Sequence, residues 1–277
     1  PPEPNDLTSP LHPTYCMDRP HILFCPKTKK YVAWLKIMGE GNRQFFSILQ
    51  ADHFFGPYSF IRKIYQPLKM NAGDFCFAES DGKAFERPHF EMICATLTDD
   101  YTGVTEEYST HYEGRKPPFT REAPTYFERN GKKYLFTSGT SGYFPNRSTV
   151  CVFDDFHGEW RDLGDPCIGD KTNTTFNSQI TCVLKIPRKD LYVAMADRWV
   201  PSKAMLAANP AIQKAFIKIF AGQEPDRTPV EETSLPGKEQ KHNENTSISR
   251  YVFLPIEWEG EKPVLRWKDE WRLEDFR

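Results

Sequence analysis

The 277-residue sequence lacks an excess of either charge sign and lacks a long apolar run. Lysine and arginine together number 36 and aspartate and glutamate 38, which gives a formal net charge of −2. A groove that follows a phosphate backbone needs a basic excess or a basic stripe, so the composition argues against a nucleic-acid partner. No apolar run approaches the roughly 18 residues of a membrane-spanning helix, so we expect no membrane partner.

The common signatures of cofactor and metal sites are also missing. The sequence has no glycine-rich phosphate loop, which argues against a nucleotide cofactor. It has no CxxC pair, and its seven histidines show no zinc-ligand spacing. No acidic loop motif requires calcium. We therefore expect a protein without a cofactor.

The cysteines give conflicting indications about the compartment. Seven cysteines cannot all pair within one chain. Most lie in apolar segments, where a free cysteine behaves as a small hydrophobic residue, so we expect reduced core thiols and favour an intracellular location. Glycosylation-type triplets at Asn146, Asn173 and Asn245 favour secretion instead. The N-terminus shows no signal-peptide pattern, but a removed signal peptide would leave the same trace, so the localisation stays open.

What the sequence has in quantity is aromatic residues and proline. Phe, Tyr and Trp make up 14% of the chain, and 23 prolines exceed 16 glycines. The aromatics exclude a disordered chain, and the absence of a short period excludes collagen-like or coiled-coil structure. The composition favours a β-rich globular protein with many short strands and turns.

Four segments repeat one pattern, in which a polar residue opens an apolar strand, a charged turn follows, and an aromatic strand completes a hairpin. The opening residues are Asp18, Asp74, Glu122 and Gln179. They recur about every 50 residues, which is the length of one β-propeller blade. Because the innermost strand of each blade lines the central axis, we expect these four residues to converge on one funnel.

One stretch departs from the pattern. Residues 211–220 predict a short amphipathic helix after Pro210, and a polar tract follows at 223–245. Strand character then returns. We interpret 203–250 as a helical and loop insertion in a single propeller domain that spans 1–277.

These segments resemble glycoside hydrolase family 43, a set of inverting five-bladed β-propeller enzymes, and in particular its exo-β-1,3-galactanase branch. The likeness spans roughly residues 15–275 and is carried by the motifs at 18–22, 73–77, 121–127, 137–146 and 174–179. In such enzymes a whole blade precedes the element that matches 16–20. The resemblance therefore implies an all-β, five-bladed propeller of which four blades are visible and the first is absent.

Inverting hydrolysis needs an acid that protonates the leaving oxygen and a base that activates water on the opposite face of the sugar. By the resemblance, Glu122 is the general acid, which must stay protonated near neutral pH, and Asp74 is the carboxylate that tunes and orients it. The first-blade aspartate that most of the family uses as base is absent. Gln179 matches the amide proposed in its place, which either positions the water or activates it as the imidic tautomer.

The resemblance also implies substrate contacts. Asp18 stands where the galactanases carry a glutamate one methylene longer, and this difference leaves the sugar open. Glu113 and Thr140 match substrate-contacting positions, and we expect Asn177 and Trp199 to bind sugar as well. Some members of the family hold an axial calcium ion, which this sequence does not indicate.

We therefore predict an inverting exo-glycosidase that releases galactose from β-1,3-linked galactan or galacto-oligosaccharides. One alternative is an arabinofuranosidase or galactofuranosidase of the same family, because family 43 pockets accept several sugars and Asp18 is altered. The other is a non-catalytic glycan-binding propeller, which the missing carboxylate base and first blade favour. Convergence of Glu122, Asp74 and Gln179 on one pocket would favour the enzyme.

Overall fold

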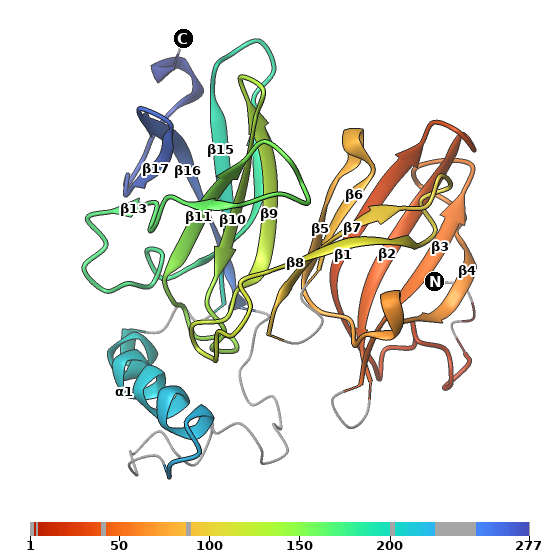
Figure 1. Ribbon diagram of the computed structural model, residues 1–277, viewed down its shortest axis with the longest axis horizontal. Coiled ribbons are helices and arrows are strands. Elements are labelled where there is room, and N and C mark those ends of the chain that lie inside the picture. The colour runs from red at the N-terminus through yellow and green to blue at the C-terminus, as the bar shows by residue number, and fades with distance from the viewer. Residues whose placement is uncertain are drawn as a thin grey trace. The chain divides into compact units, whose positions relative to one another are not determined.

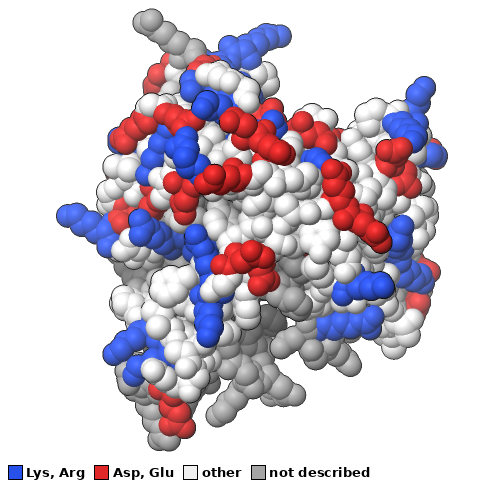
Figure 2. Space-filling view, viewed as in Figure 1, with Lys and Arg blue, Asp and Glu red and all other residues white. Residues whose placement is uncertain are grey.

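The structure is a computed structural model that describes residues 3, 5–39, 43–86, 90–199, 203–224 and 248–276 (Figure 1). The chain divides into two compact units, one of Pro1–Gly114 with Asp155–Glu159 and one of Arg115–Asp154 with Trp160–Arg277. Acidic and basic side chains are interspersed on the face that Figure 2 shows. Among the described residues no helix is long and apolar enough to cross a membrane. The single domain over 1–277 stays a prediction.

The first unit contains two four-stranded antiparallel sheets whose strands follow one another in chain order. The first sheet consists of β1 (Cys16–Cys25), β2 (Lys30–Met38), β3 (Gln44–Ala51) and β4 (Ser59–Tyr65). The second consists of β5 (Phe75–Ala78), β6 (Lys83–Glu86), β7 (Met92–Leu97) and β8 (Val104–His111). Two short 3-10 helices, η2 (Pro67–Lys69) and η3 (Glu79–Asp81), lie in the connections.

The second unit contains a four-stranded and a five-stranded sheet. The smaller sheet consists of β9 (Glu122–Arg129), β10 (Lys132–Ser138), β11 (Ser148–Phe153) and β12 (Arg161–Asp162). The larger sheet consists of β13 (Cys167–Ile168), β14 (Gln179–Lys185), β15 (Tyr192–Arg198), β16 (Arg250–Glu259) and β17 (Lys262–Arg266), followed by the 3-10 helix η5 (Leu273–Asp275). Strand β13 pairs in parallel with β17, so the last strand of the chain is covered by an earlier one.

All four predicted hairpins form, and the four sheets confirm the predicted all-β propeller class with four blades in this chain. Local turn chemistry accounts for the hairpins. Asn130 and Gly131 between β9 and β10 both have positive φ angles, of 53° and 75°, as a tight two-residue turn requires. Strands β1, β5, β9 and β14, which the predicted opening residues begin or nearly begin, are each an edge strand of their sheet.

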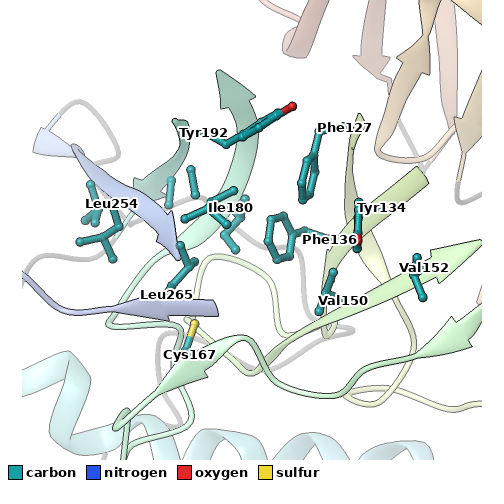
Figure 3. Close-up of a cluster of buried hydrophobic side chains, with 14 residues drawn as sticks. Phe127, Tyr134, Phe136, Val150, Val152, Cys167, Ile180, Tyr192, Leu254 and Leu265 are labelled. Carbon is teal, nitrogen blue, oxygen red and sulfur yellow. The ribbon is translucent and has the colours of Figure 1, made fainter. Parts of the chain in front are cut away.

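The aromatic residues supply much of each core. In the first unit Trp34, Phe46 and Phe75 are nearly inaccessible, and the Trp34 indole donates to the carbonyl of Tyr101 at 2.8 Å. Figure 3 shows the core of the second unit, where Phe127 lies 5.2 Å from the Phe136 ring. Such pairs contribute roughly 0.5–1.5 kcal/mol beyond the area they bury.

The predicted core thiols are confirmed for five of the seven cysteines, and none of the seven forms a disulfide. Buried cysteines lie at 25, 76, 94, 151 and 167, whereas Cys182 is half-buried. Burial raises the pKa of Cys94 to about 12, so this thiol stays protonated at neutral pH. Cys16 is exposed at the start of β1, which agrees with a prediction made for most of the cysteines and not for all of them.

Helix α1 (Lys203–Phe220) is longer than the sequence predicts, and Pro210 lies inside it. An internal proline removes one backbone hydrogen bond and costs roughly 3 kcal/mol. The buried side chains of Ile212 and Phe216 pack against Phe144 and offset part of that cost. The predicted start after Pro210 is therefore wrong, and most of the polar tract at 223–245 lies outside the described residues.

Candidate active site

Glu122 and Gln179 meet in the second unit. Each is the first residue of an edge strand, Glu122 of β9 and Gln179 of β14, and these two strands pack against each other. The Gln179 Nε2 group donates to Glu122 Oε1 at 3.4 Å and to Ser138 Oγ at 2.9 Å. Glu122 and Gln179 are half-buried, whereas Ser138 is buried. The structure thus brings two of the predicted catalytic residues into direct contact, and it adds a hydroxyl on Gln179 that the sequence did not indicate.

The orientation of the Gln179 amide follows from its third partner. The Trp199 indole lies 3.4 Å from Gln179 Oε1, and an indole N–H can only donate. The amide oxygen must therefore face Trp199, which turns the amide nitrogen toward Ser138 and Glu122. As a consequence Glu122 Oε1 is an acceptor, and a proton on this carboxyl belongs on Oε2.

The backbone beside these residues adopts uncommon conformations. Ala123, directly after Glu122, has a φ of 51°, and Thr175, Phe176 and Asn177 have successive φ values of 55°, 55° and 60°. For residues other than glycine each such conformation costs about 1–2 kcal/mol. Strain of this kind persists only where surrounding contacts impose it, and it concentrates at functional sites.

Two charged side chains impose the conformation of the segment 174–177. The Asp170 carboxylate accepts from the backbone N–H groups of Thr174 and Phe176, at 2.8 and 3.0 Å. The Arg198 guanidinium donates to the carbonyls of Phe176 and Asn177, at 2.8 and 3.1 Å. The segment is thus held on both its donor and its acceptor side, which fixes the start of β14 and with it Gln179.

A small pocket lies beside Gln179. Its lining includes the predicted residues Asn177 and Trp199 and the unpredicted Asp197, together with Ser178 and the segment 142–146. Tyr143 and Trp199 form one aromatic corner, with ring centroids 5.5 Å apart at 58°. An aromatic corner with carboxylate and amide groups next to it is chemically suited to a sugar, which has an apolar ring face and many hydroxyls.

The loop that carries Tyr143 is closed by Asn146. Its side chain accepts from the Gly139 N–H at 2.6 Å and donates to the Gly139 carbonyl and to Ser141 Oγ, both at 2.7 Å. A side chain at Gly139 would meet the Pro118 carbonyl at 2.5 Å, so only glycine fits there. Because Asn146 is buried, its glycosylation-type triplet has a structural explanation.

Asp74 and Asp18 belong to the first unit, where both lie next to Lys36. Asp74 is paired with Lys36 Nζ at 3.0 Å and with Arg19 Nε at 3.2 Å, and Asp18 lies 3.7 Å from Lys36 Nζ. Burial alone would lower the pKa of Lys36, but the carboxylates of Asp74 and Asp18 outweigh it and the net pKa is raised. The two cations favour the ionised form of Asp74.

The remaining predicted contacts do not line the pocket. Glu113 is exposed in the turn after β8 of the first unit. Thr140 is half-buried and its hydroxyl accepts from that of Thr120 at 2.8 Å. In the part of the chain that the structure describes, no group of three or more His, Cys, Asp or Glu side chains is placed to hold a metal ion.

The sequence did not predict two residues of the site, Asp197 and Ser138, and only Asp197 has a position in the sequence that could have indicated it. Asp197 lies directly across from Gln179 in the β14–β15 ladder, so both side chains leave the same face of the sheet. The signal was its position at the end of a strand, two residues before Trp199. Ser138 is paired with Glu122 across β9 and β10, which only the register reveals.

The fold is similar to solved structures of glycoside hydrolase family 43. A family 43 β-1,3-galactosidase, BT0265, gives a TM-score of 0.70 at 25% identity, over 95% of this chain and 47% of its own. A second, BT3683, solved with galactodeoxynojirimycin, gives 0.71 at 23% identity over 97% and 80%. An exo-β-1,3-galactanase from Phanerochaete chrysosporium, solved with β-1,3-galactotriose, gives 0.66 at 20% identity over 94% and 50%.

No protein-family model and no curated protein sequence matches the chain. The chain spans about half the length of the first and third of these structures, 47% and 50%. The structures confirm the resemblance to family 43 and to its galactanase branch that the sequence motifs predict.

Proposed function

We propose that this chain is an inverting glycoside hydrolase that releases galactose from the ends of β-1,3-linked galactan or galacto-oligosaccharides. The observation that carries the proposal is the contact between Glu122 and Gln179 at the starts of two packed edge strands, next to an aromatic-lined pocket. The similar structures support the choice of substrate, since two are β-1,3-galactosidases and the third, an exo-β-1,3-galactanase, was solved with β-1,3-galactotriose.

Glu122 is the general acid of the proposed reaction. It protonates the oxygen that leaves when the bond to the terminal galactose breaks. Because the Gln179 amide donates to Oε1, the transferred proton comes from Oε2. The Ser138 and Trp199 contacts hold the amide in this orientation, so the carboxyl is preorganised for donation.

The geometry favours a positioning role for Gln179 over the role of a base. In inverting enzymes acid and base stand roughly 6.5–9.5 Å apart, so that sugar and water fit between them. Gln179 Nε2 lies only 3.4 Å from the Glu122 carboxyl, which leaves no such space between the two groups. We keep water positioning by Gln179 as the prediction from the resemblance, to be tested separately from its contact with the acid.

Asp74, Asp18, Glu113 and Thr140 enter the proposal on the resemblance alone. Asp74 is the ionised carboxylate that assists the acid, and its ion pairs with Lys36 and Arg19 suit that role because they keep it charged and fixed. Asp18, Glu113 and Thr140 are proposed to contact sugar hydroxyls.

Replacement of the acid tests the proposal. We expect Glu122→Gln to reduce kcat on β-1,3-galacto-oligosaccharides at least 100-fold, because general acid catalysis contributes about 10²–10⁴-fold. The matched control is Glu128→Gln, an exposed glutamate on the same strand, which should leave kcat unchanged. Full activity of Glu122→Gln, with a normal circular dichroism spectrum, would refute the assignment.

A non-catalytic glycan-binding propeller is the second candidate. The observation in its favour is that Gln179, which the resemblance puts in place of the base, is a neutral amide that lies only 3.4 Å from Glu122, too close for an inverting base. Binding of β-1,3-galactotriose by calorimetry without any release of galactose would establish it. Faster hydrolysis of an aryl arabinofuranoside than of an aryl galactopyranoside would instead indicate the furanosidase alternative.

A further inference from the structure

One face of helix α1 packs against the loop 139–146, which forms a wall of the pocket. Ile212 and Phe216 are buried with Phe144 of that loop in a separate hydrophobic cluster, and Phe220 packs partly against it. Their spacing of four residues places them on one side of the helix. Figure 1 shows α1 outside the two sheets of its unit, at one end of their strands.

Two amides on the same face of α1 hold the loop backbone. Asn209 Nδ2 donates to the Pro145 carbonyl at 2.9 Å, and Gln213 Nε2 lies 3.4 Å from the same oxygen. Gln213 Nε2 also lies 3.3 Å from Ser141 Oγ, the hydroxyl that the closing asparagine of the loop contacts. A single carbonyl of the pocket wall is therefore bound from two consecutive turns of the helix.

Core packing alone would not favour an asparagine at position 209. Asn209 is buried, and within the described part of the chain its Oδ1 has no hydrogen-bond partner. A buried polar atom left without a partner costs about 1–3 kcal/mol, which an aliphatic side chain of similar size avoids. The hydrogen bond to the Pro145 carbonyl, and not core packing, therefore explains the amide at position 209.

The loop 139–146 contributes to the proposed sugar pocket through Tyr143, which lines it. Its ring packs 5.5 Å from that of Trp199, whose indole donates to Gln179 at 3.4 Å. A shift of the loop would therefore change the aromatic corner next to the catalytic amide. A pyranose chair presents a flat apolar face that matches a rigid corner, whereas a smaller and more flexible furanose ring depends less on it.

We propose that α1 determines the specificity of the pocket, with Asn209 and Gln213 as positioning residues that favour a galactopyranose over a five-membered sugar ring. The inference rests on the proposed function and adds the element that selects the ring. The two amides act by fixing the loop wall and do not touch the sugar.

The test compares Asn209→Leu and Gln213→Leu with wild type on 4-nitrophenyl β-D-galactopyranoside and 4-nitrophenyl α-L-arabinofuranoside. Loss of one hydrogen bond of about 1.4 kcal/mol should lower kcat/KM for the galactopyranoside about tenfold, through KM, with kcat and the furanoside unchanged. The control is Lys214→Gln, an exposed position on the same helix, which should change nothing. An equal fall on both substrates, or no fall, overturns the proposal.

A binding measurement separates this inference from the proposed function. Titration with galactose, followed by tryptophan fluorescence in the Glu122→Gln background, reports on the pocket without hydrolysis. We expect galactose to bind about tenfold more weakly when Asn209→Leu is added, with an unchanged thermal melt. Equal binding with and without Asn209→Leu overturns the role of α1 and leaves the assignment of Glu122 intact. Undiminished hydrolysis by Glu122→Gln refutes the acid and leaves the binding comparison valid.

Discussion

At the scale of single residues, the site depends on how one amide is held. Gln179 contacts an acid, a hydroxyl and an indole, and the donor-only indole decides which end of the amide meets the acid. Reciprocal contacts of this kind fix a side chain more firmly than any one of them would. In the proposed reaction, the ability of Glu122 to donate its proton therefore depends on these neighbours as well as on its own position.

Ser138 offers the cleanest test of that view. Ser138→Ala removes the 2.9 Å contact and frees the Gln179 amide to rotate, so we expect kcat to fall about tenfold with little change in KM. Ser138→Thr keeps the hydroxyl and should retain most of the activity. Equal kcat values for Ser138→Ala and wild type would show that the hydroxyl does not position the amide.

At the scale of elements, the two proposed catalytic residues Glu122 and Gln179 each stand at the start of a strand. The sequence pattern predicted these positions because an Asn-Gly turn and alternating apolar residues mark a hairpin locally. It could not show that β9 and β14 pack together or that Ser138 is opposite Glu122, since both depend on register. The early start of α1 was missed for a related reason, because packing onto Phe144 outweighs the local effect of Pro210.

The strained segment before β14 provides a prediction at this scale. Arg198→Lys keeps the charge but loses the planar fork that binds two carbonyls, so the segment 175–177 should relax. We expect a loss of about 1.5–3 kcal/mol in the free energy of unfolding, measured in urea, together with lower activity. Arg250→Lys, at the exposed position paired with Arg198 across β15 and β16, is the control and should cost little. Equal losses for both variants would show that the two hydrogen bonds from Arg198 do not hold the segment 175–177.

At the scale of the whole molecule, the free energy of unfolding should depend on pH through a buried acid, Glu86, and a buried base, His21. Burial raises the pKa of Glu86 to about 8, so the folded state holds a proton that the unfolded state releases near 4.5. This group therefore destabilises the protein increasingly as pH rises from about 4.5 to about 8. Burial lowers the pKa of His21 to about 4, so this group destabilises the protein as pH falls below about 6.5.

Glu86→Gln isolates the first of these effects. The variant has nothing to ionise, so its melting temperature should exceed that of wild type at pH 8, and the two should converge toward pH 4.5. Thermal melts monitored by circular dichroism between pH 4.5 and 8 would measure the difference. Parallel curves for the two proteins would show that Glu86 does not keep its proton in the folded state.

Much of the fold and part of the site were thus open to prediction from the sequence. The blade-length repeat identified the sheets because each hairpin is specified locally, and the resemblance pointed to Glu122 and Gln179, which the structure brings into contact. It did not identify Asp197, which reaches the pocket only because β14 and β15 align it with Gln179. Residues whose role arises from contacts between distant strands leave no local pattern in the chain.

The most direct test of the central claim is the anomer of the first product. Proton NMR can follow the terminal galactose as it is released from β-1,3-galactotriose, before its anomers equilibrate and while the leaving galactobiose is still intact. An inverting enzyme that uses Glu122 as its acid should release α-galactose first, and the Glu122→Gln variant should release almost none. Initial release of β-galactose, or undiminished release by the variant, would contradict the account.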